Sequence, residues 1–360
     1  LIFFMTINCQ KNNNTRIIRL GHGLNSNHSV HKAFVFMDSI LNEKSNGKMK
    51  LKIYPNEQLG TERQCLELLQ IGSLDITKVS SGALENFSPI TKVLGLPFLF
   101  RDSQHSYSVL DGPIGKEILS RTEKYWLKGL AFYDAGSRSF YTMDNPIHNP
   151  SDLNGLKIRV MESKIAFDMV KSLGGSPTPI SFGELYTSLQ QGVVDGAENN
   201  LPSFYLSRHY EVCKFYTMDE HTILPDVLLI STHSWNTFSQ LEKKWFNESV
   251  LLSVIEQRRL WSESEKESLK AITDFGVKII KPSKELFQKK AKDKTFINLD
   301  ADPKTNVDPN YEIAIKALQY LQNEKGVKKV ESERFSTNNI VSGRFEVKVS
   351  QYGPLIIDDT

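Results

Sequence analysis

The amino-acid sequence predicts an α/β protein with two lobes and one long helix that runs along both. Three observations support this prediction. The chain of 360 residues has room for two ordinary domains. Segments with strand and helix periodicities alternate from residue 16 onwards. Residues 239–275 contain neither proline nor glycine, and a continuous helix there would be ~55 Å long, which exceeds one small domain.

The first third of the chain alternates between strands and helices. Three strand patterns enclose two amphipathic helix patterns, and in chain order these segments are 17–21, 30–43, 49–54, 61–70 and 74–79. Thr61 is suited to cap the second helix. This order predicts a partly parallel sheet with covering helices.

A second α/β unit follows. It comprises a helix at 103–126, a strand at 129–133, a strand near Ile158, helices at 164–173 and 182–191, and a strand at 193–194. The long helix over 239–275 completes the pattern, and a break at 262–264 is the alternative interpretation.

Composition excludes several classes of protein. A content of 39% hydrophobic and 24% charged residues is typical of a globular protein. The formal net charge of +2 gives no overall attraction to nucleic acid or membrane. Cys9, Cys65 and Cys213 are odd in number and widely spaced, and no Cys/His cluster has zinc-like spacing, so we expect no structural disulfide and no metal site. We also expect no cofactor. Cys65 lies within a helix pattern and is expected to be buried.

The start of the chain resembles the end of an export signal. Residues 1–9 are apolar up to Cys9, and polar residues follow at 10–14. A run of this kind also resembles a bacterial lipoprotein signal with an acylated Cys9, although Thr6 and Asn8 depart from that pattern. The alternative is ordinary sequence with a fortuitous cysteine. The run is shorter than the ~20 residues that span a bilayer.

Two arginines and one asparagine occur where apolar strands run into polar sequence. Arg138 follows the strand pattern at 129–133, Arg159 follows Ile158, and Asn199 follows the valines at 193–194. Ligands of open α/β sheets bind at such strand ends. No nucleophile, metal cluster or phosphate loop accompanies these residues. The pattern indicates capture of an acid rather than its conversion.

Six motifs resemble those of one family. In chain order they are YPNEQLG at 54–60, GSLD at 72–75, LPF at 96–98, GLKIRV at 155–160, ELY at 184–186 and VDGAEN at 194–199. Over residues 19–281 the chain resembles the extracytoplasmic solute-binding proteins of TRAP (tripartite ATP-independent periplasmic) transporters. The resemblance implies the two-lobed periplasmic-binding-protein, or Venus flytrap, fold. It also implies a monomeric periplasmic protein that closes on a small carboxylate and delivers it to a sodium-coupled membrane permease.

The resemblance also implies roles for individual residues. Arg159 matches the arginine that pairs with the ligand carboxylate, for which a planar guanidinium is well suited. The alternative is a structural salt bridge to Glu162 or Glu198. Arg138 matches a second arginine near the hinge, and its alternative is a surface position. Asn199 matches an asparagine whose amide can donate and accept, or it forms a turn.

Five further residues are candidates for contact with the ligand, each with a structural alternative. Phe182 is expected to pack against the ligand or to belong to the core. Ser80 and Ser81 are expected to face the cleft or to cap a helix. Glu62 can accept from hydroxyl groups or favour a helix dipole. His28 lies at the mouth of the first lobe or in an exposed loop.

The sequence around Asn199 is most similar to the branch of the family that binds uronic acids. Arg138 lies in a segment that fits the same branch, although Ser137 stands where an aromatic residue is common. We therefore expect a hexuronate, with sialic acid, dicarboxylates and 2-oxo acids as alternatives. A sugar-acid enzyme that uses His28, His221 or Glu198 as a base is the rival from another class, and a sensor domain is a third possibility.

The predicted division of the chain has four parts. These are a signal remnant or tether at 1–15, a first lobe at 16–135 plus 227–262, a second lobe at 136–226 plus 263–324, and an unassigned extension at 325–360. After about residue 289 the chain departs from the family. There, 311–323 is amphipathic and 343–349 alternates like a strand.

Overall fold

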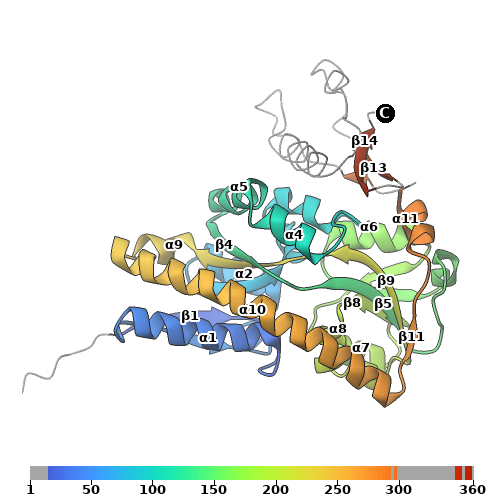
Figure 1. The fold of residues 1–360 in the computed structure, drawn as a ribbon, viewed down its shortest axis with the longest axis horizontal. Coiled ribbons are helices and arrows are strands. Elements are labelled where there is room, and N and C mark those ends of the chain that lie inside the picture. The colour runs from blue at the N-terminus through green and yellow to red at the C-terminus, as the bar shows by residue number, and fades with distance from the viewer. Residues whose placement is uncertain (1–14, 293–295, 298–344, 351–352, 359–360) are drawn as a thin grey trace, which may run out of the picture.

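The computed structural model describes residues 15–292, 296–297, 345–350 and 353–358. Two large sheets with covering helices form the body of the protein, as Figure 1 shows. The fold is the two-lobed α/β fold predicted from the sequence. None of the helices in these ranges is long and apolar enough to cross a bilayer.

The first sheet has five strands in the order β2-β1-β3-β10-β4. Their bounds are β1 (Arg16–Gly21), β2 (Met49–Tyr54), β3 (Ile76–Ser80), β4 (Leu127–Tyr133) and β10 (Asp226–Ser231). Strand β1 pairs in parallel with β2 and β3, whereas β10 is antiparallel to β3 and β4. This partly parallel arrangement confirms the prediction from the opening strand and helix pattern.

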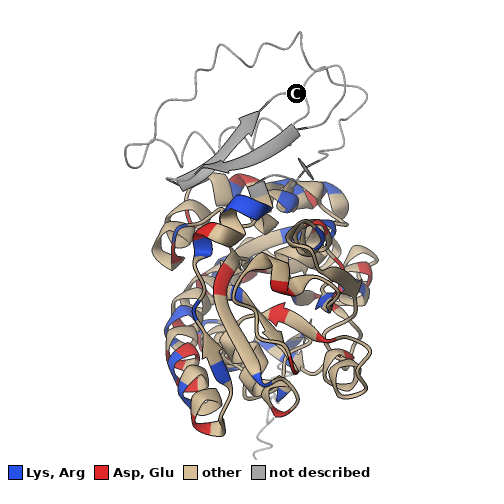
Figure 2. Cartoon of the chain, turned by 90° about the vertical axis from the view of Figure 1, so that its right-hand side faces the viewer, with Lys and Arg blue, Asp and Glu red and all other residues tan. Residues whose placement is uncertain are grey.

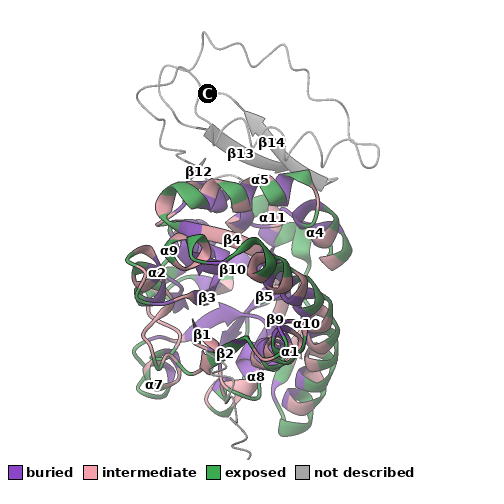
Figure 3. Ribbon diagram, turned by 90° about the vertical axis from the view of Figure 1, so that its left-hand side faces the viewer, coloured by how far each residue is buried: buried purple, intermediate pink, exposed green. Residues whose placement is uncertain are grey.

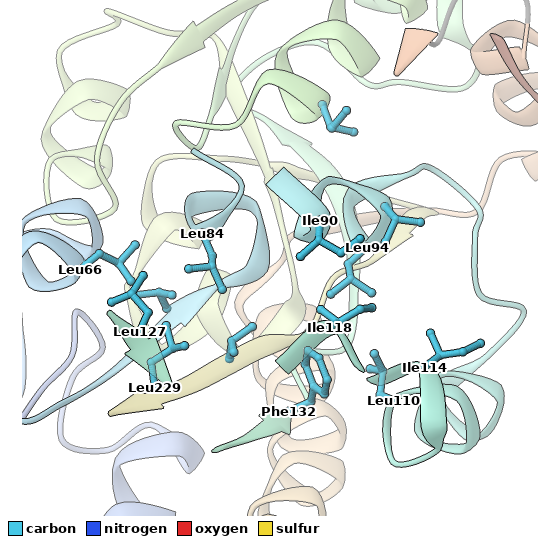
Figure 4. Close-up of a cluster of buried hydrophobic side chains, with 14 of the residues drawn as sticks. Leu66, Leu84, Ile90, Leu94, Leu110, Ile114, Ile118, Leu127, Phe132 and Leu229 are labelled. Carbon is cyan, nitrogen blue, oxygen red and sulfur yellow. The ribbon is translucent and has the colours of Figure 1, made fainter. Parts of the chain in front are cut away.

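Helices cover both faces of the first sheet. Helix α1 (Ser29–Lys44) packs on one face together with part of α10 (Gln240–Phe275). Helices α2 (Glu62–Gln70), α4 (Ser103–Leu110) and α5 (Pro113–Arg121) cover the other. Figure 4 shows this second apolar layer, which includes Leu66, Ile118 and Phe132. Thr61 caps α2 through a capping box, as predicted, and Cys65 is buried.

The second sheet has six strands in the order β11-β9-β5-β8-β6-β7. They are β5 (Ser137–Thr142), β6 (Lys157–Val160), β7 (Ser176–Pro179), β8 (Gly196–Asn199), β9 (Phe215–Ile223) and β11 (Lys278–Ile280). The helices of this lobe are α6 (Lys164–Leu173), α7 (Leu185–Gln190), α8 (Leu201–Leu206) and α11 (Lys284–Lys292). Buried strands occupy the middle of each lobe and exposed helix faces surround them (Figure 3).

Two crossovers and one helix connect the lobes. The chain passes from β4 to β5 at residues 134–136 and returns from β9 to β10 at residues 224–225. Helix α10 runs without a break for 36 residues and contacts α1 and β4 of the first lobe and α8 of the second (Figure 1). The predicted bracing helix is confirmed, and the alternative of a break at 262–264 is wrong.

Three local predictions are wrong. The helix expected at 103–126 is divided into α4, α5 and a 3-10 turn, because Pro113 has no N–H donor and restricts Gly112 to an extended conformation. The helix expected at 182–191 begins only at Leu185. The strand expected at 193–194 lies in a turn that follows Gly192 (φ +66°), and pairing begins at Gly196.

A small third sheet contains β12 (Phe296–Ile297), β13 (Phe345–Ser350) and β14 (Gly353–Asp358). Strand β13 confirms the strand expected near 343–349. Cys9 and the amphipathic segment at 311–323 lie outside the described residues. Basic and acidic residues are interspersed over the two lobes (Figure 2), in keeping with the small net charge.

Gln257 ties α10 to the first crossover, and its loss tests this link. The buried Gln257 amide accepts from Asp134 N at 2.8 Å and donates to Asp134 O at 2.7 Å. We expect Gln257→Leu to lower the free energy of unfolding by about 2–4 kcal/mol, because two buried backbone groups lose their partner. Urea unfolding measures the change. Glu263→Ala, which removes an exposed ion pair on the same helix, should stay within ~0.5 kcal/mol of the parent. Equal effects of the two changes would contradict the role of Gln257.

Candidate functional site

A pocket of about 590 Å³, including space open to solvent, lies where the two lobes meet. Its volume is within the ~300–1,000 Å³ range of small-molecule sites. Seven of the eight predicted ligand-binding residues line it, and these are His28, Glu62, Ser80, Arg138, Arg159, Phe182 and Asn199. Ser81 does not line the pocket. It is fully buried in the first turn of the short helix that Ser80 caps.

Arg159 is a buried cation without an acidic partner among the described residues. It lies in β6 next to β8 and is 3% exposed. Its Nε donates to the carbonyl of Ile180 at 2.8 Å, and no described carboxylate lies within ion-pair distance of the guanidinium. The alternative of a salt bridge to Glu162 or Glu198 is therefore wrong. Both Nη groups remain available to a ligand.

The electrostatics of Arg159 reflect this isolation. Burial lowers the pKa of Arg159, and the opposing effects of Tyr141 and Glu198 do not offset it. A buried charge without a partner is costly, and an anion placed beside it recovers much of that cost. The site is thus arranged to attract one negative group.

Arg138 is buried too, but its charge is already neutralised. Its Nε and Nη2 bond to the Glu198 carboxylate, and Nη1 donates to Asn199 Oδ1 at 2.9 Å. Glu198 also approaches His221 Nε2 at 3.4 Å, and His221 Nδ1 lies 2.8 Å from Asp219. The alternative of a surface position for Arg138 is wrong. Four of its five N–H groups serve protein partners, because Nη2 also donates to the Glu198 carbonyl.

This network shifts the pKa values of its members in opposite directions. Burial alone would raise the pKa of Glu198, but Arg138 and His221 outweigh it and lower the pKa to about 2. Burial alone would lower the pKa of His221, but Asp219 and Glu198 outweigh it and raise the pKa to about 9. His221 is consequently protonated at neutral pH and fixes Glu198 against Arg138.

Asn199 presents its amide nitrogen to the pocket. Its Oδ1 accepts from Arg138 and from the backbone N of Asn200 at 2.9 Å each. Two donors on one oxygen define the orientation of the amide. The remaining NH₂ group can donate to a ligand carboxylate. Asn199 and Arg159 lie on the neighbouring strands β8 and β6.

The first lobe contributes a buried charged cluster that sequence reasoning found only in part. Lys78 Nζ lies 2.8 Å from Asp226 and 3.4 Å from Glu62. Glu62 also accepts from the backbone N of Ser80 at 3.0 Å. Burial raises the pKa of Glu62 despite the opposing effect of Lys78. Lys78 and Asp226 were missed because each lies within an apolar strand pattern, where a single charge is the only signal.

Four further residues that line the pocket are Phe182, His28, Glu57 and Trp261. Phe182 is half-buried before α7 and contacts the cores of both lobes. His28 is not an exposed loop residue: it caps α1 and is 1% exposed. Sequence reasoning also missed Glu57 and Trp261, which both line the pocket. Glu57 lies within the YPNEQLG motif and Trp261 within the long helix, and no local pattern marks either residue as a ligand contact.

Direct contacts hold the two lobes together around the pocket. Glu57 accepts from the backbone N of Gly183 at 3.2 Å. Asn86 donates to the carbonyl of Glu162 at 2.6 Å. These four residues pair the first lobe with the second at the rim, so a bound molecule would be enclosed from both sides.

The proposed bases of an enzyme are poorly placed for proton transfer. His221 and Glu198 are fully buried, belong to the ionic network and do not line the pocket. His28 does line it, but burial lowers its pKa well below the usual value. Within the described residues no group of three His, Cys, Asp or Glu side chains could hold a metal ion.

Comparison with known proteins gives consistent results. The family model "Bacterial extracellular solute-binding protein, family 7" matches residues 20–295. A TRAP periplasmic solute-binding protein from Bradyrhizobium sp., in complex with α/β-D-galacturonate, is 39% identical, with a TM-score of 0.77 over 84% of this chain and 100% of that one. A second, from Chromohalobacter salexigens with bound D-glucuronate, is 32% identical, with a TM-score of 0.75 over 85% and 97%.

A curated relative agrees with these structures. The 2,3-diketo-L-gulonate-binding periplasmic protein YiaO of Escherichia coli is 29% identical over 267 residues, which are 73% of this chain and 80% of that protein. The predicted resemblance to TRAP solute-binding proteins is thereby confirmed. The chain belongs to family 7 of the bacterial extracellular solute-binding proteins.

Proposed function

We propose that this protein captures a hexuronate, such as galacturonate or glucuronate, between its lobes and delivers it to a sodium-coupled membrane permease. The observation that carries the proposal is the buried Arg159, whose Nη groups have no partner in the described part of the chain. Arg159 binds the ligand carboxylate, and the amide nitrogen of Asn199 donates to the same group. Arg138 orients Asn199 through a hydrogen bond, and its own charge is neutralised by Glu198 and does not bind the ligand.

The charges of the two lobes favour a sugar acid over a dicarboxylate. On the second lobe Arg159 has no carboxylate partner among the residues that the structure describes, while Arg138 is neutralised by Glu198. On the first lobe a single cation, Lys78, faces the carboxylates of Glu62, Asp226 and Glu57. A ligand that suits both lobes has one carboxylate at one end and hydroxyl groups, which donate to carboxylates, at the other.

The relatives support this choice of ligand class. The two solved structures hold galacturonate and glucuronate, and the E. coli relative is named for a diketogulonate. Each of these molecules carries one carboxylate and several further oxygens. Glu62 and Ser80 then serve the hydroxyl groups, and Phe182 packs against the sugar ring.

The lobes close about the two crossovers. We assign 16–135 plus 227–262 to the first lobe and 136–226 plus 263–324 to the second. The strands of the first sheet fall in the first set and those of the second sheet in the second, apart from Asp226 at the boundary. The closed state is favoured only by contacts that the ligand makes better there, such as a carboxylate held by Arg159. The protein acts as a periplasmic monomer, with Cys9 as a lipid anchor.

Replacement of each arginine should separate ligand binding from stability. We expect Arg159→Gln to weaken galacturonate binding by ~30- to several-thousand-fold, or about 2–5 kcal/mol, because the carboxylate loses its cation. The ligand-free protein should lose no stability, because an unpaired buried charge is removed. Isothermal titration calorimetry and thermal unfolding measure the two effects.

Arg138→Gln provides the contrast. It breaks a buried ion pair with Glu198 and should lower the free energy of unfolding by about 3–5 kcal/mol. Binding by Arg159→Gln within threefold of the parent protein would disprove the role of Arg159.

The first lobe should reject a second carboxylate. We expect galacturonate to bind at least a hundredfold more tightly than galactarate, because the added charge of galactarate meets Glu62 and Asp226. Competition titration against a bound hexuronate measures the ratio. Equal affinities would argue for a dicarboxylate-binding protein.

The network behind Arg138 predicts a pH dependence of stability. The folded pKa of His221, about 9, lies above its reference value of 6.5. The stabilisation from protonated His221 is therefore complete below pH 6.5 and disappears as the pH rises to about 9. We expect the unfolding midpoint to fall across this interval, and His221→Gln to reduce the slope. The exposed His148 supplies the control, His148→Gln, which should leave the slope unchanged.

A further inference from the structure

Two buried N–H groups in the pocket have no hydrogen-bond partner among the described residues. They are Nε2 of His28 and Nε1 of Trp261. Both residues are 1% exposed, both line the pocket, and their ring centroids lie 5.7 Å apart. Buried donors are almost always paired, so two neighbouring exceptions in one pocket indicate a group that is bound there.

The His28 nitrogen is a donor. Its Nδ1 accepts from the backbone N of Val30 at 3.2 Å in the cap of α1. Burial lowers the pKa of His28 well below the usual value, so the ring is neutral. A neutral imidazole whose Nδ1 accepts carries its hydrogen on Nε2.

The Trp261 nitrogen is a donor in every state. Glu265, one helical turn further along α10, lies beside the indole and next to Gly136, and Trp261 partly opposes the rise that burial causes in the pKa of its carboxyl group. The contact does not have the geometry of a formed hydrogen bond, so the indole N–H is still free to donate to a ligand. Besides the Asn199 amide, the pocket therefore has two neutral ring donors, one from the start of α1 and one from the middle of α10.

We propose that His28 Nε2–H and Trp261 Nε1–H donate to one hydroxyl oxygen of the sugar acid and select for it. The assignment rests on the proposed function. A hydroxyl suits the site because it accepts from both donors and still has a hydrogen to give. Glu62 and Asp226, which line the same pocket, are acceptors for that hydrogen. A methylene in its place would leave both donors buried and unpaired.

The test combines variants with a series of monodeoxy galacturonates. Trp261→Phe removes one donor, and His28→Asn removes the other while keeping a residue that caps helices well. We expect each change to weaken galacturonate binding about three- to tenfold. One monodeoxy analogue should bind the parent protein more weakly, and neither variant should weaken that analogue further. Trp245→Phe, on the same helix but outside the pocket, should bind every acid like the parent.

The analogue series distinguishes a lost donor from lost packing. Trp261→Phe also removes ring volume, and a packing effect would lower affinity for every analogue by the same factor. That result, or unchanged binding of galacturonate by both variants, would overturn the proposal. If the parent protein binds no hexuronate, the proposed function itself is wrong. If it binds hexuronates but none of the deoxy analogues cancels the effect of both variants, only the hydroxyl assignment is wrong.

Discussion

The burial of Arg159 with no carboxylate partner in the described part of the chain is the constraint on which the rest of the site depends. A lone guanidinium at 3% exposure is costly, and among the described residues the Ile180 carbonyl alone accepts a hydrogen bond from it. The neighbouring Arg138 would increase the repulsion if it were free. Glu198, which His221 supports, neutralises Arg138, so Arg159 is the unpaired cation among the described residues that line the pocket. One such charge specifies one anionic group, and that makes a monocarboxylate the natural ligand.

The opposite lobe completes this specification. Lys78 of that lobe forms ion pairs with both Glu62 and Asp226, so its charge is neutralised within the protein. What remains on that side is an excess of acceptors. A pocket with a positive end and an acceptor-rich end orients a hydroxylated acid before the lobes close. Under the proposed function the two lobes have separate tasks, because one holds the carboxylate and the other distinguishes the hydroxyl groups.

Sequence reasoning reached the architecture and most of the pocket, for identifiable reasons. The unbroken α10 could be predicted because its segment contains neither proline nor glycine. The cap of α2 could be predicted because Thr61 stands directly before the helix pattern. The prediction of one helix at 103–126 is wrong because Pro113 interrupts an otherwise helical segment and starts a new helix, α5. Lys78 and Asp226 were missed because pairing across β3 and β10 brings distant residues together, and no local pattern reports that contact. Ser81 does not line the pocket because it is buried in the first turn of the short helix that Ser80 caps.

Helix α10 connects recognition with lobe geometry. It carries Gln257, which holds the backbone of Asp134 in the first crossover, and Trp261, which lines the pocket one turn later. Glu265 then lies against Gly136 in the same crossover. A ligand that engages the indole therefore acts on the element that holds the crossover in place. Closure requires contacts that differ between the open and closed states. Under the proposed contact between Trp261 and the ligand, one helix links the ligand to the crossover within three turns and can transmit such a difference to the lobes.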